Sequence, residues 1–301
     1  MALMHIHLFG AATPTGEALK QQFCSTDSAL PLVAYSRRAP SCLPADFTDP
    51  DAFHPGGVPN SPALWISFGP IWLLSPFMDR LARAYPERLQ GLRALIACSS
   101  SSAITKRFAA NRFDRELVVR LTTAEDQLLA TCRRLQLPCR IFRPTLIYGR
   151  VGSYVDRNLS RIIQLMRWLP LLPVPEHTGL RQPIHATQLA AVACESVRQF
   201  ASGGWNPQLS ERIALGGDSE LSYAVMLRAL QQALPHKDPA RRCRLLSLPN
   251  RFFYAAAAPL LLQSPKAFEA VLRMSSDLSG FTPAHQLLNA EPQPFPVLPL
   301  I

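Results

Sequence analysis

Two glycines near the start of the chain have the spacing of a phosphate-binding turn. Gly10 and Gly16 follow an apolar run and precede a helix-forming one, with Thr13, Pro14 and Thr15 between them. Glycine at such a turn permits a tight bend, a close approach of backbone to pyrophosphate, and close helix–strand contact. The N-terminus of the following helix offers N–H groups to the anion. Thr13 occupies the middle position, where glycine is usual; it narrows the space, but its hydroxyl can donate a hydrogen bond.

An arginine pair follows the second apolar run. The sequence passes through Ser36 into Arg37 and Arg38 without a carboxylate. At this position an acidic side chain holds the ribose hydroxyls of NAD, whereas arginine accommodates the additional phosphate of NADP. The pair therefore predicts NADP(H) in preference to NAD(H), with a solvated arginine pair on a loop as the alternative. Further on, Asp46 lies where a carboxylate can meet the adenine edge.

The overall composition argues against several classes of protein. The formal charge is +10, from 31 basic residues, nearly all of them arginine, and 21 acidic ones. The basic residues are scattered and not interleaved with aromatic ones, which argues against nucleic acid as a partner. The seven cysteines lie far apart without a Cys-x-x-Cys pair, so neither a disulfide framework nor a metal site is expected. We find no secretion signal and no apolar run long enough to span a bilayer, and we expect a cytoplasmic protein.

The elements that position these residues follow from the hydrophobic pattern. Apolar runs alternate with helical stretches, as in a parallel sheet with crossover helices. We expect strands over residues 3–9, 30–35, 63–68, 92–98, 139–142 and 212–215, and helices over residues 16–23, 75–85, 115–135, 159–168, 186–200 and 222–234. The prediction is an α/β protein. It has a Rossmann-type doubly wound parallel sheet over residues 1–200 and a smaller, closely packed C-terminal substrate lobe over residues 201–301.

Five segments between about residues 5 and 200 carry a resemblance to a known family. They are Gly10 to Gly16, Asp46 to Asp49, the serine run Ser99 to Ser102, the Arg-Pro-Thr-x-x-Tyr-Gly run from Arg143 to Gly149, and the Arg-x-x-x-His segment from Arg181 to His185. In this order they resemble the extended short-chain dehydrogenases/reductases, often described as NAD-dependent epimerases/dehydratases. The Arg-Pro run is the most specific of the five.

The resemblance implies a role for each matching position. It places the glycine turn around the pyrophosphate of the cofactor, and Arg37 at the adenosine ribose or its phosphate. It places Asp46 and Phe47 at the adenine, and the serine run, beginning with Ser99, beside the nicotinamide, whose pocket Pro144 helps to line. It also implies that Arg181 faces the substrate, since relatives use arginine there against a nucleotide-sugar phosphate.

The family's proton relay is missing from this sequence. The relay uses a tyrosine as acid and base and a lysine four residues later, whose charge lowers the pKa of the tyrosine. Between residues 107 and 147 this chain has neither a tyrosine nor a lysine. The tyrosine position falls on Leu117 or Val118, and the lysine position falls on Leu121 or Thr122.

Two interpretations of the missing relay remain open, and a third, a scaffold without cofactor, stands behind them. The chain is an oxidoreductase or epimerase of nucleotide-sugar-like substrates with another proton donor, or it is a catalytically silent dinucleotide-binding sensor or accessory subunit. A polar pocket at the nicotinamide favours the first, and an apolar wall favours the second. The candidate donors are Ser100, Ser101, Lys106, Tyr148, Tyr154 and His185, with Ser100, Ser101 and Tyr148 preferred.

Further side chains are candidates for substrate contacts. Arg157 and Asn158 open a basic helix that approaches the substrate in relatives, with a capped, solvated helix as the alternative. Arg181 and His185 complete the set, and a buried structural histidine is the alternative for the latter. A homodimer or a larger complex is the expected assembly.

Overall fold

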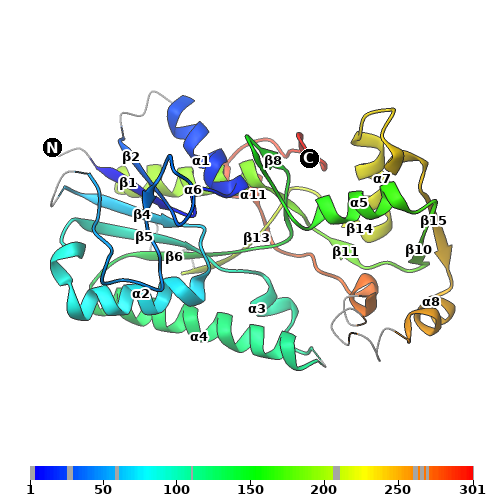
Figure 1. Ribbon diagram of the computed structural model, residues 1–301, viewed down its shortest axis with the longest axis horizontal. Coiled ribbons are helices and arrows are strands. Elements are labelled where there is room, and N and C mark those ends of the chain that lie inside the picture. Colours follow the sequence, from blue (N-terminus) through cyan, green and yellow to red (C-terminus); the bar gives the residue numbers. More distant parts are fainter. Residues whose placement is uncertain are drawn as a thin grey trace.

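A sheet of eight strands, all parallel, forms the centre of the computed structural model (Figure 1). The structure describes residues 4–25, 30–57, 61–109, 111–205, 211–259, 264, 268 and 271–300. The strand order is β16-β13-β6-β5-β4-β1-β2-β3. The strands are β1 (His5–Phe9), β2 (Leu32–Ser36), β3 (Leu43–Pro44), β4 (Ala63–Ser67), β5 (Leu92–Cys98), β6 (Cys139–Pro144), β13 (Arg212–Gly216) and β16 (Thr282–Pro283). The run β3-β2-β1-β4-β5-β6 within this order is that of the Rossmann fold, which confirms the prediction.

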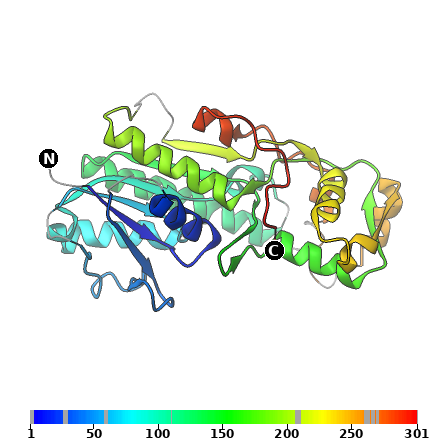
Figure 2. The same cartoon turned by 90° about the horizontal axis from the view of Figure 1, so that it is seen from above.

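Helices cover both faces of the sheet (Figures 1 and 2). On one face lie α1 (Pro14–Ser25), α6 (Ala186–Ala201) and α11 (Ala284–Leu288), and on the other lie α2 (Ile71–Ala84) and α4 (Arg112–Arg134). This double cover explains why β1 and β4 consist of residues that are all buried, since a parallel sheet is shielded on both sides.

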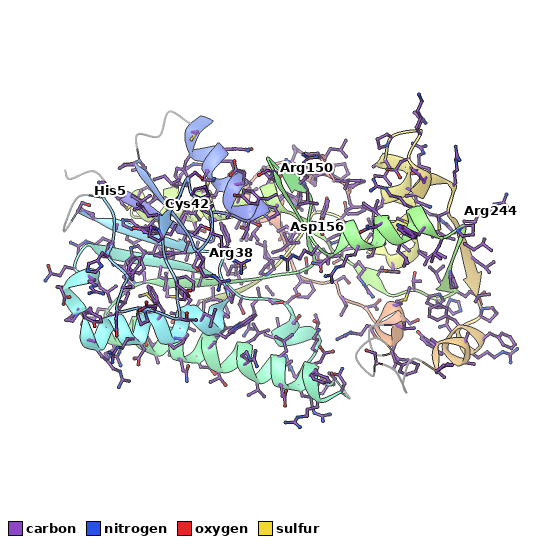
Figure 3. All side chains as sticks on the ribbon, viewed as in Figure 1. His5, Arg38, Cys42, Arg150, Asp156 and Arg244 are labelled. Carbon is purple, nitrogen blue, oxygen red and sulfur yellow. The ribbon has the colours of Figure 1, made fainter. Side chains whose placement is uncertain are left out.

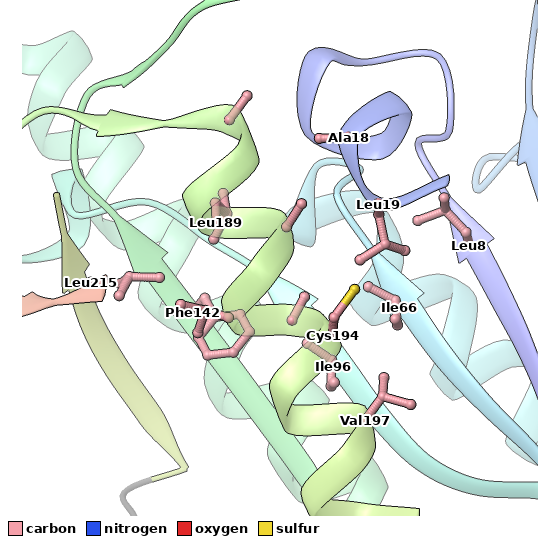
Figure 4. Packing of buried hydrophobic residues seen from close by; sticks show 14 of the residues in the cluster. Leu8, Ala18, Leu19, Ile66, Ile96, Phe142, Leu189, Cys194, Val197 and Leu215 are labelled. Atoms are coloured by element: carbon pink, nitrogen blue, oxygen red, sulfur yellow. The ribbon is translucent and has the colours of Figure 1, made fainter. Parts of the chain in front are cut away.

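The packing of α6 on the sheet shows what holds one layer in place. Leu189, Cys194 and Val197 of α6 lie against the sheet beside Phe142 and Ile96 (Figure 4). All five side chains are buried. Burying a side chain of this kind contributes roughly 1.5–3 kcal/mol for the larger ones, so the layer is held chiefly by apolar contact.

A second, smaller unit extends from the sheet, on the right of Figure 1. It contains α5 (Leu159–Trp168), β10 (Leu171–Pro175), α7 (Tyr223–Ala233), β15 (Arg244–Leu248) and α8 (Asn250–Ala257). Its own apolar core includes Ile163, Met166 and Leu227. α5 and β10 come from before residue 200, while β13 and β16 come from after it and complete the large sheet. A boundary at residue 200 therefore does not separate the units, because the chain crosses between them several times.

Short elements connect the two units. They are α3 (Ser102–Thr105), β7 (Ile147–Tyr148), β8 (Arg150–Val151), β9 (Tyr154–Val155), β11 (Leu180–Arg181), β12 (Ile184–His185) and β14 (Leu221–Ser222). The antiparallel hairpin of β8 and β9 packs against α1, so it brings the start of the second unit close to the glycine turn.

Candidate functional site

A cleft of about 1040 Å³ opens at the carboxyl ends of β1, β2, β4 and β5. The turns after these strands contribute Gly10, Arg37, Gly69 and Ser99 to its lining. Open α/β sheets bind ligands at this edge, and the volume is at the upper end for ligand pockets. The predicted residues that line the cleft are Gly10, Thr13, Arg37, Arg38, Asp46, Phe47, Ser99, Ser100 and Arg157.

The glycine turn has the geometry that only glycine permits at both ends. Gly10 has φ of +76°, and a Cβ at Gly16 would lie 2.4 Å from the carbonyl oxygen of Gly10. The Thr13 hydroxyl turns back into the loop, where it donates to the Gly10 carbonyl at 2.8 Å and accepts from the Gly16 N–H at 3.0 Å. Thr13 therefore caps α1, with Pro14 at the first helical position. The hydroxyl donates a hydrogen bond, as its chemistry allows, and in this structure the acceptor is the Gly10 carbonyl within the turn.

Pro14, Thr15 and Gly16 belong to the same turn but do not face the cleft. Thr15 is buried, and neither it nor Pro14 nor Gly16 lines the cleft. Their contribution is to hold the N-terminus of α1 close to the end of β1, which leaves the backbone of Gly10, Ala12 and Thr13 facing the cleft.

The arginine pair lies at the end of β2. Arg37 and Arg38 are both exposed and both line the cleft. Within the part of the chain that the structure describes, neither forms an ion pair with a carboxylate. The hydroxyl of Ser36 accepts hydrogen bonds from the N–H groups of Arg38 and Ala39, which fixes the turn that carries the pair.

Asp46 and Phe47 lie beside this pair. The Asp46 carboxylate accepts hydrogen bonds from the N–H and the hydroxyl of Thr48, and these bonds lower its pKa, with a smaller effect from Arg37. The Phe47 ring packs on Phe9. A Cβ at Gly69 would lie 2.7 Å from the Phe47 ring, so this second glycine turn also requires its glycine.

The turn after β4 was missed at the sequence level. Its residues Phe68, Gly69 and Pro70 line the cleft, followed by Trp72 of α2. The signal was present, since a Gly-Pro pair directly follows a buried strand and marks a strand-to-helix turn.

The serine run is tied to a buried carboxylate. Ser99 donates its hydroxyl proton to Oε1 of Glu125 at 2.5 Å. Glu125 is wholly buried in α4 and also accepts from the guanidinium groups of Arg143 and Arg212. The hydroxyl proton of Ser99 is therefore engaged by Glu125, and the hydroxyl oxygen can only accept a further hydrogen bond. Ser100, which also lines the cleft, accepts from the N–H of Ser102 through its hydroxyl oxygen.

The wall that faces these serines is apolar. Leu121 of α4, one of the two positions predicted for the missing lysine, lines the cleft together with Trp72 and Ile147. Leu117 packs against the neighbouring core, and the Thr122 hydroxyl donates to the carbonyl of Val118. Burial raises the pKa of the Cys98 thiol, which also lines the cleft, to about 12, so it stays protonated at neutral pH. No ionisable side chain of α4 is part of the lining.

Tyr148, a preferred donor, and His185, a further candidate, lie outside the cleft lining. The hydroxyl of Tyr148 accepts from the N–H of Val297, and burial raises its pKa. His185 caps α6 by accepting from the Thr187 N–H, and burial lowers its pKa. Both side chains are thus engaged in holding β7, β12 and the C-terminal segment together.

Arg181, Ser101 and Pro144 also lie outside the lining. The guanidinium of Arg181 is nearly buried and donates to the carbonyl groups of Leu180, Arg273 and Ser276. These bonds use it as a structural clamp between β11 and the segment after α8. Ser101 donates its N–H to the carbonyl of Pro144, which joins the ends of β5 and β6.

The hairpin that faces the glycine turn adds two polar groups. Tyr154 and Arg157 line the cleft from the side of the second unit. Asp156 anchors this segment, since its carboxylate accepts from the N–H groups of Gly149, Asn158 and Leu159 (Figure 3). Asn158 itself is exposed and lies outside the lining.

Comparison with known proteins identifies the fold. No protein-family model matches the chain, and no curated protein sequence matches it. Among solved structures, the human epimerase family protein SDR39U1 with NADPH is 12% identical with a TM-score of 0.62, covering 98% of this chain and 96% of that one. RMD from Pseudomonas aeruginosa with NADPH is 13% identical with a TM-score of 0.61, covering 96% and 94%. UDP-glucuronic acid 4-epimerase from Bacillus cereus with NAD is 13% identical with a TM-score of 0.60, covering 96% and 92%. The chain therefore has the fold of the extended short-chain dehydrogenases/reductases.

Proposed function

We propose that this chain binds NADP(H) in the cleft. The arginine pair carries the proposal, because Arg37 and Arg38 are exposed in the lining and form no ion pair among the described residues. Two guanidinium groups at the end of β2 that are not paired with a described carboxylate suit the phosphate on the adenosine ribose, which distinguishes NADP from NAD. Of the three similar structures, two were solved with NADPH and one with NAD, which supports a nicotinamide dinucleotide in the cleft.

The remaining lining fits the other parts of such a cofactor. The backbone of the glycine turn at Gly10 would hold the pyrophosphate, and Phe47 would cover the adenine. The oxygen of Ser99, with its own proton held by Glu125, would accept from the nicotinamide carboxamide. When bound, the cofactor supplies hydride-transfer chemistry, and the chain's residues position it and exclude water.

We propose further that the protein works as a dinucleotide-binding sensor or accessory subunit. The apolar wall supports this role, because Leu121 stands where a catalytic lysine would be needed and α4 offers no ionisable group to the cleft. In the test, NADPH is mixed with the protein and with nucleotide sugars or small carbonyl compounds, and nicotinamide absorbance is followed. The sensor role predicts binding without oxidation of NADPH, and sustained oxidation would contradict it.

A second candidate is an oxidoreductase or epimerase of nucleotide-sugar-like substrates. Tyr154 and Arg157 favour it, since a phenol and an exposed guanidinium lie in the same cleft as Ser100. The proposed roles are a proton donor for Tyr154 and a contact to substrate phosphate for Arg157. If turnover is found, Tyr154→Phe should lower kcat at least about tenfold, in line with general acid catalysis. Tyr148→Phe, outside the cleft, is the matched control, and equal rates in the two variants would exclude Tyr154 as the donor.

The cellular setting belongs to the same proposal. We propose a cytoplasmic location, and a homodimer or a larger complex as the assembly. Fractionation of cells and light scattering of the purified chain test the two statements separately.

A further inference from the structure

The outer end of the second unit carries exposed apolar side chains on a flat ribbon. In β10 and β15, which pair in parallel, Leu171 lies opposite Arg244 and Pro173 lies opposite Leu246. Side chains alternate along a strand, so these four share one face, and all four are exposed. Trp168, at the end of α5 and 80% exposed, lies three residues before Leu171 in the sequence. We call these five residues the ribbon face.

The opposite side of the same ribbon is ordinary core. Leu172 and Leu245, which alternate with the exposed residues, pack against the apolar cluster of the second unit. Folding therefore accounts for one side of the ribbon only. Leu171 and Leu246 remain 48% and 45% exposed.

Basic side chains outnumber acidic ones around the ribbon face, where Glu176, directly after β10, is an exposed carboxylate. Residues 157–175 and 239–259 contain no acidic side chain. They contain seven arginines, namely Arg157, Arg161, Arg167, Arg241, Arg242, Arg244 and Arg251. Of these, Arg167 is neutralised by Asp238, just outside the second range, at 2.7 Å. Figure 3 shows Arg244 at the far end of the molecule from Arg38, so the charge at the ribbon is separate from the cleft, whereas Arg157 belongs to the cleft lining.

The adjoining helix, α8, also combines an exposed apolar side chain with an arginine. In α8, Phe252 is 57% exposed, and the guanidinium of Arg251 lies 4.8 Å from its ring centroid. Because α8 contacts β10, it extends the surface beside the ribbon face. An exposed aromatic side chain with a neighbouring arginine is typical of surfaces that enter the head-group region of a membrane.

We propose that the ribbon face binds the surface of an anionic phospholipid bilayer. Trp168, Leu171 and Leu246 would enter the head-group region, while Arg244 and Arg251 pair with lipid phosphates. A second copy of this chain is a poor occupant, because a two-fold contact would bring the two arginine-rich faces together. No described helix is long and apolar enough to cross a bilayer, so the attachment would be peripheral.

The test is flotation of the full chain with vesicles of phosphatidylcholine alone, or of phosphatidylcholine mixed with phosphatidylglycerol. We expect binding to the mixed vesicles, weakened by added salt. Trp168→Ser combined with Leu246→Ser should lower the partition coefficient about tenfold or more, from the apolar area lost. Arg244→Glu should lower it roughly tenfold on mixed vesicles and leave phosphatidylcholine vesicles unaffected. Phe108→Ser is the matched control, since Phe108 is 93% exposed but belongs to the turn after α3.

Three results would overturn the proposal: no binding of the unaltered chain to mixed vesicles, equal binding of the double variant, or a change of solution mass in the double variant. The last would show that the ribbon face joins two copies. Thermal unfolding of each variant identifies any that fails to fold, and Arg244→Glu then decides alone. The outcome is independent of NADP(H) binding, because none of the altered residues lines the cleft.

Discussion

Replacing Gly16 by alanine tests the glycine turn most sharply. A Cβ at this position would lie 2.4 Å from the Gly10 carbonyl oxygen and 2.8 Å from Cα of Ala11. Ordinary contact needs about 3.5 Å, so the start of α1 must move by about 1 Å away from β1. Overpacking of this kind costs about 1–3 kcal/mol, whereas alanine for glycine inside a helix normally stabilises by about 1 kcal/mol. We expect the free energy of unfolding to fall by about 1–3 kcal/mol.

The same displacement should weaken the binding of the dinucleotide, because the pyrophosphate has to approach this turn closely. We expect the Kd for NADPH to rise about tenfold or more. Urea unfolding and a fluorescence titration measure the two effects. Gly204→Ala is the matched control, since Gly204 is exposed and no atom lies closer than 3.4 Å to a Cβ built there. An unchanged or higher free energy of unfolding for Gly16→Ala, together with an unchanged Kd for NADPH, would show that a Cβ at this position does not displace α1.

Two further predictions concern the buried polar groups around the sheet. Burial lowers the pKa of His7 to about 4, below its ordinary value of 6.5, so the stability that its neutral form gives is lost as pH falls between these values. We expect the protonation of this histidine to lower the free energy of unfolding by about 2 kcal/mol between pH 7 and pH 5. The urea midpoint of His7→Phe should therefore depend less on pH than that of the unaltered protein. Parallel pH curves for the two proteins would contradict this. Glu125→Gln removes the buried negative charge that pairs with Arg143 and Arg212. It should therefore lower the free energy of unfolding by about 3 kcal/mol. Asp126→Asn, which removes a 72% exposed partner of Arg212, should cost under about 1 kcal/mol, and equal costs would count against the buried network.

Much of the sheet could be predicted because its strands and helices have strong local patterns. The strand expected over 3–9 is His5–Phe9, and the helix expected over 115–135 is Arg112–Arg134. Each is a long apolar or amphipathic run bounded by turn residues, and the carboxyl edge of the sheet follows from the βα alternation. Residues on those turns, such as Arg37 and Ser99, line the cleft, and their contacts to a cofactor stay a prediction.

The side chains whose role depends on distant partners could not be predicted. Tyr148 belongs to a motif, but its hydroxyl is occupied by Val297, which is 149 residues away. Arg181 is likewise held by carbonyl groups more than 90 residues further along the chain. The parallel pairing of β10 with β15 also joins segments that no local pattern relates. In each case tertiary packing determines the partner. The hydrophobic periodicity of a single sequence predicts local helices and strands, but it does not indicate which distant residues will pair.

The central claim is that the cleft binds NADP(H) through the arginine pair. The most direct measurement is a titration of the purified chain with NADPH and with NADH, following nicotinamide fluorescence, for the unaltered protein and for Arg37→Ala. The account predicts tighter binding of NADPH than of NADH, and a loss of about tenfold or more in Arg37→Ala for NADPH alone, since a charged hydrogen bond to the phosphate is removed. Equal affinities for the two nucleotides in both proteins would contradict the arginine assignment, and no binding of either would contradict the cofactor site itself.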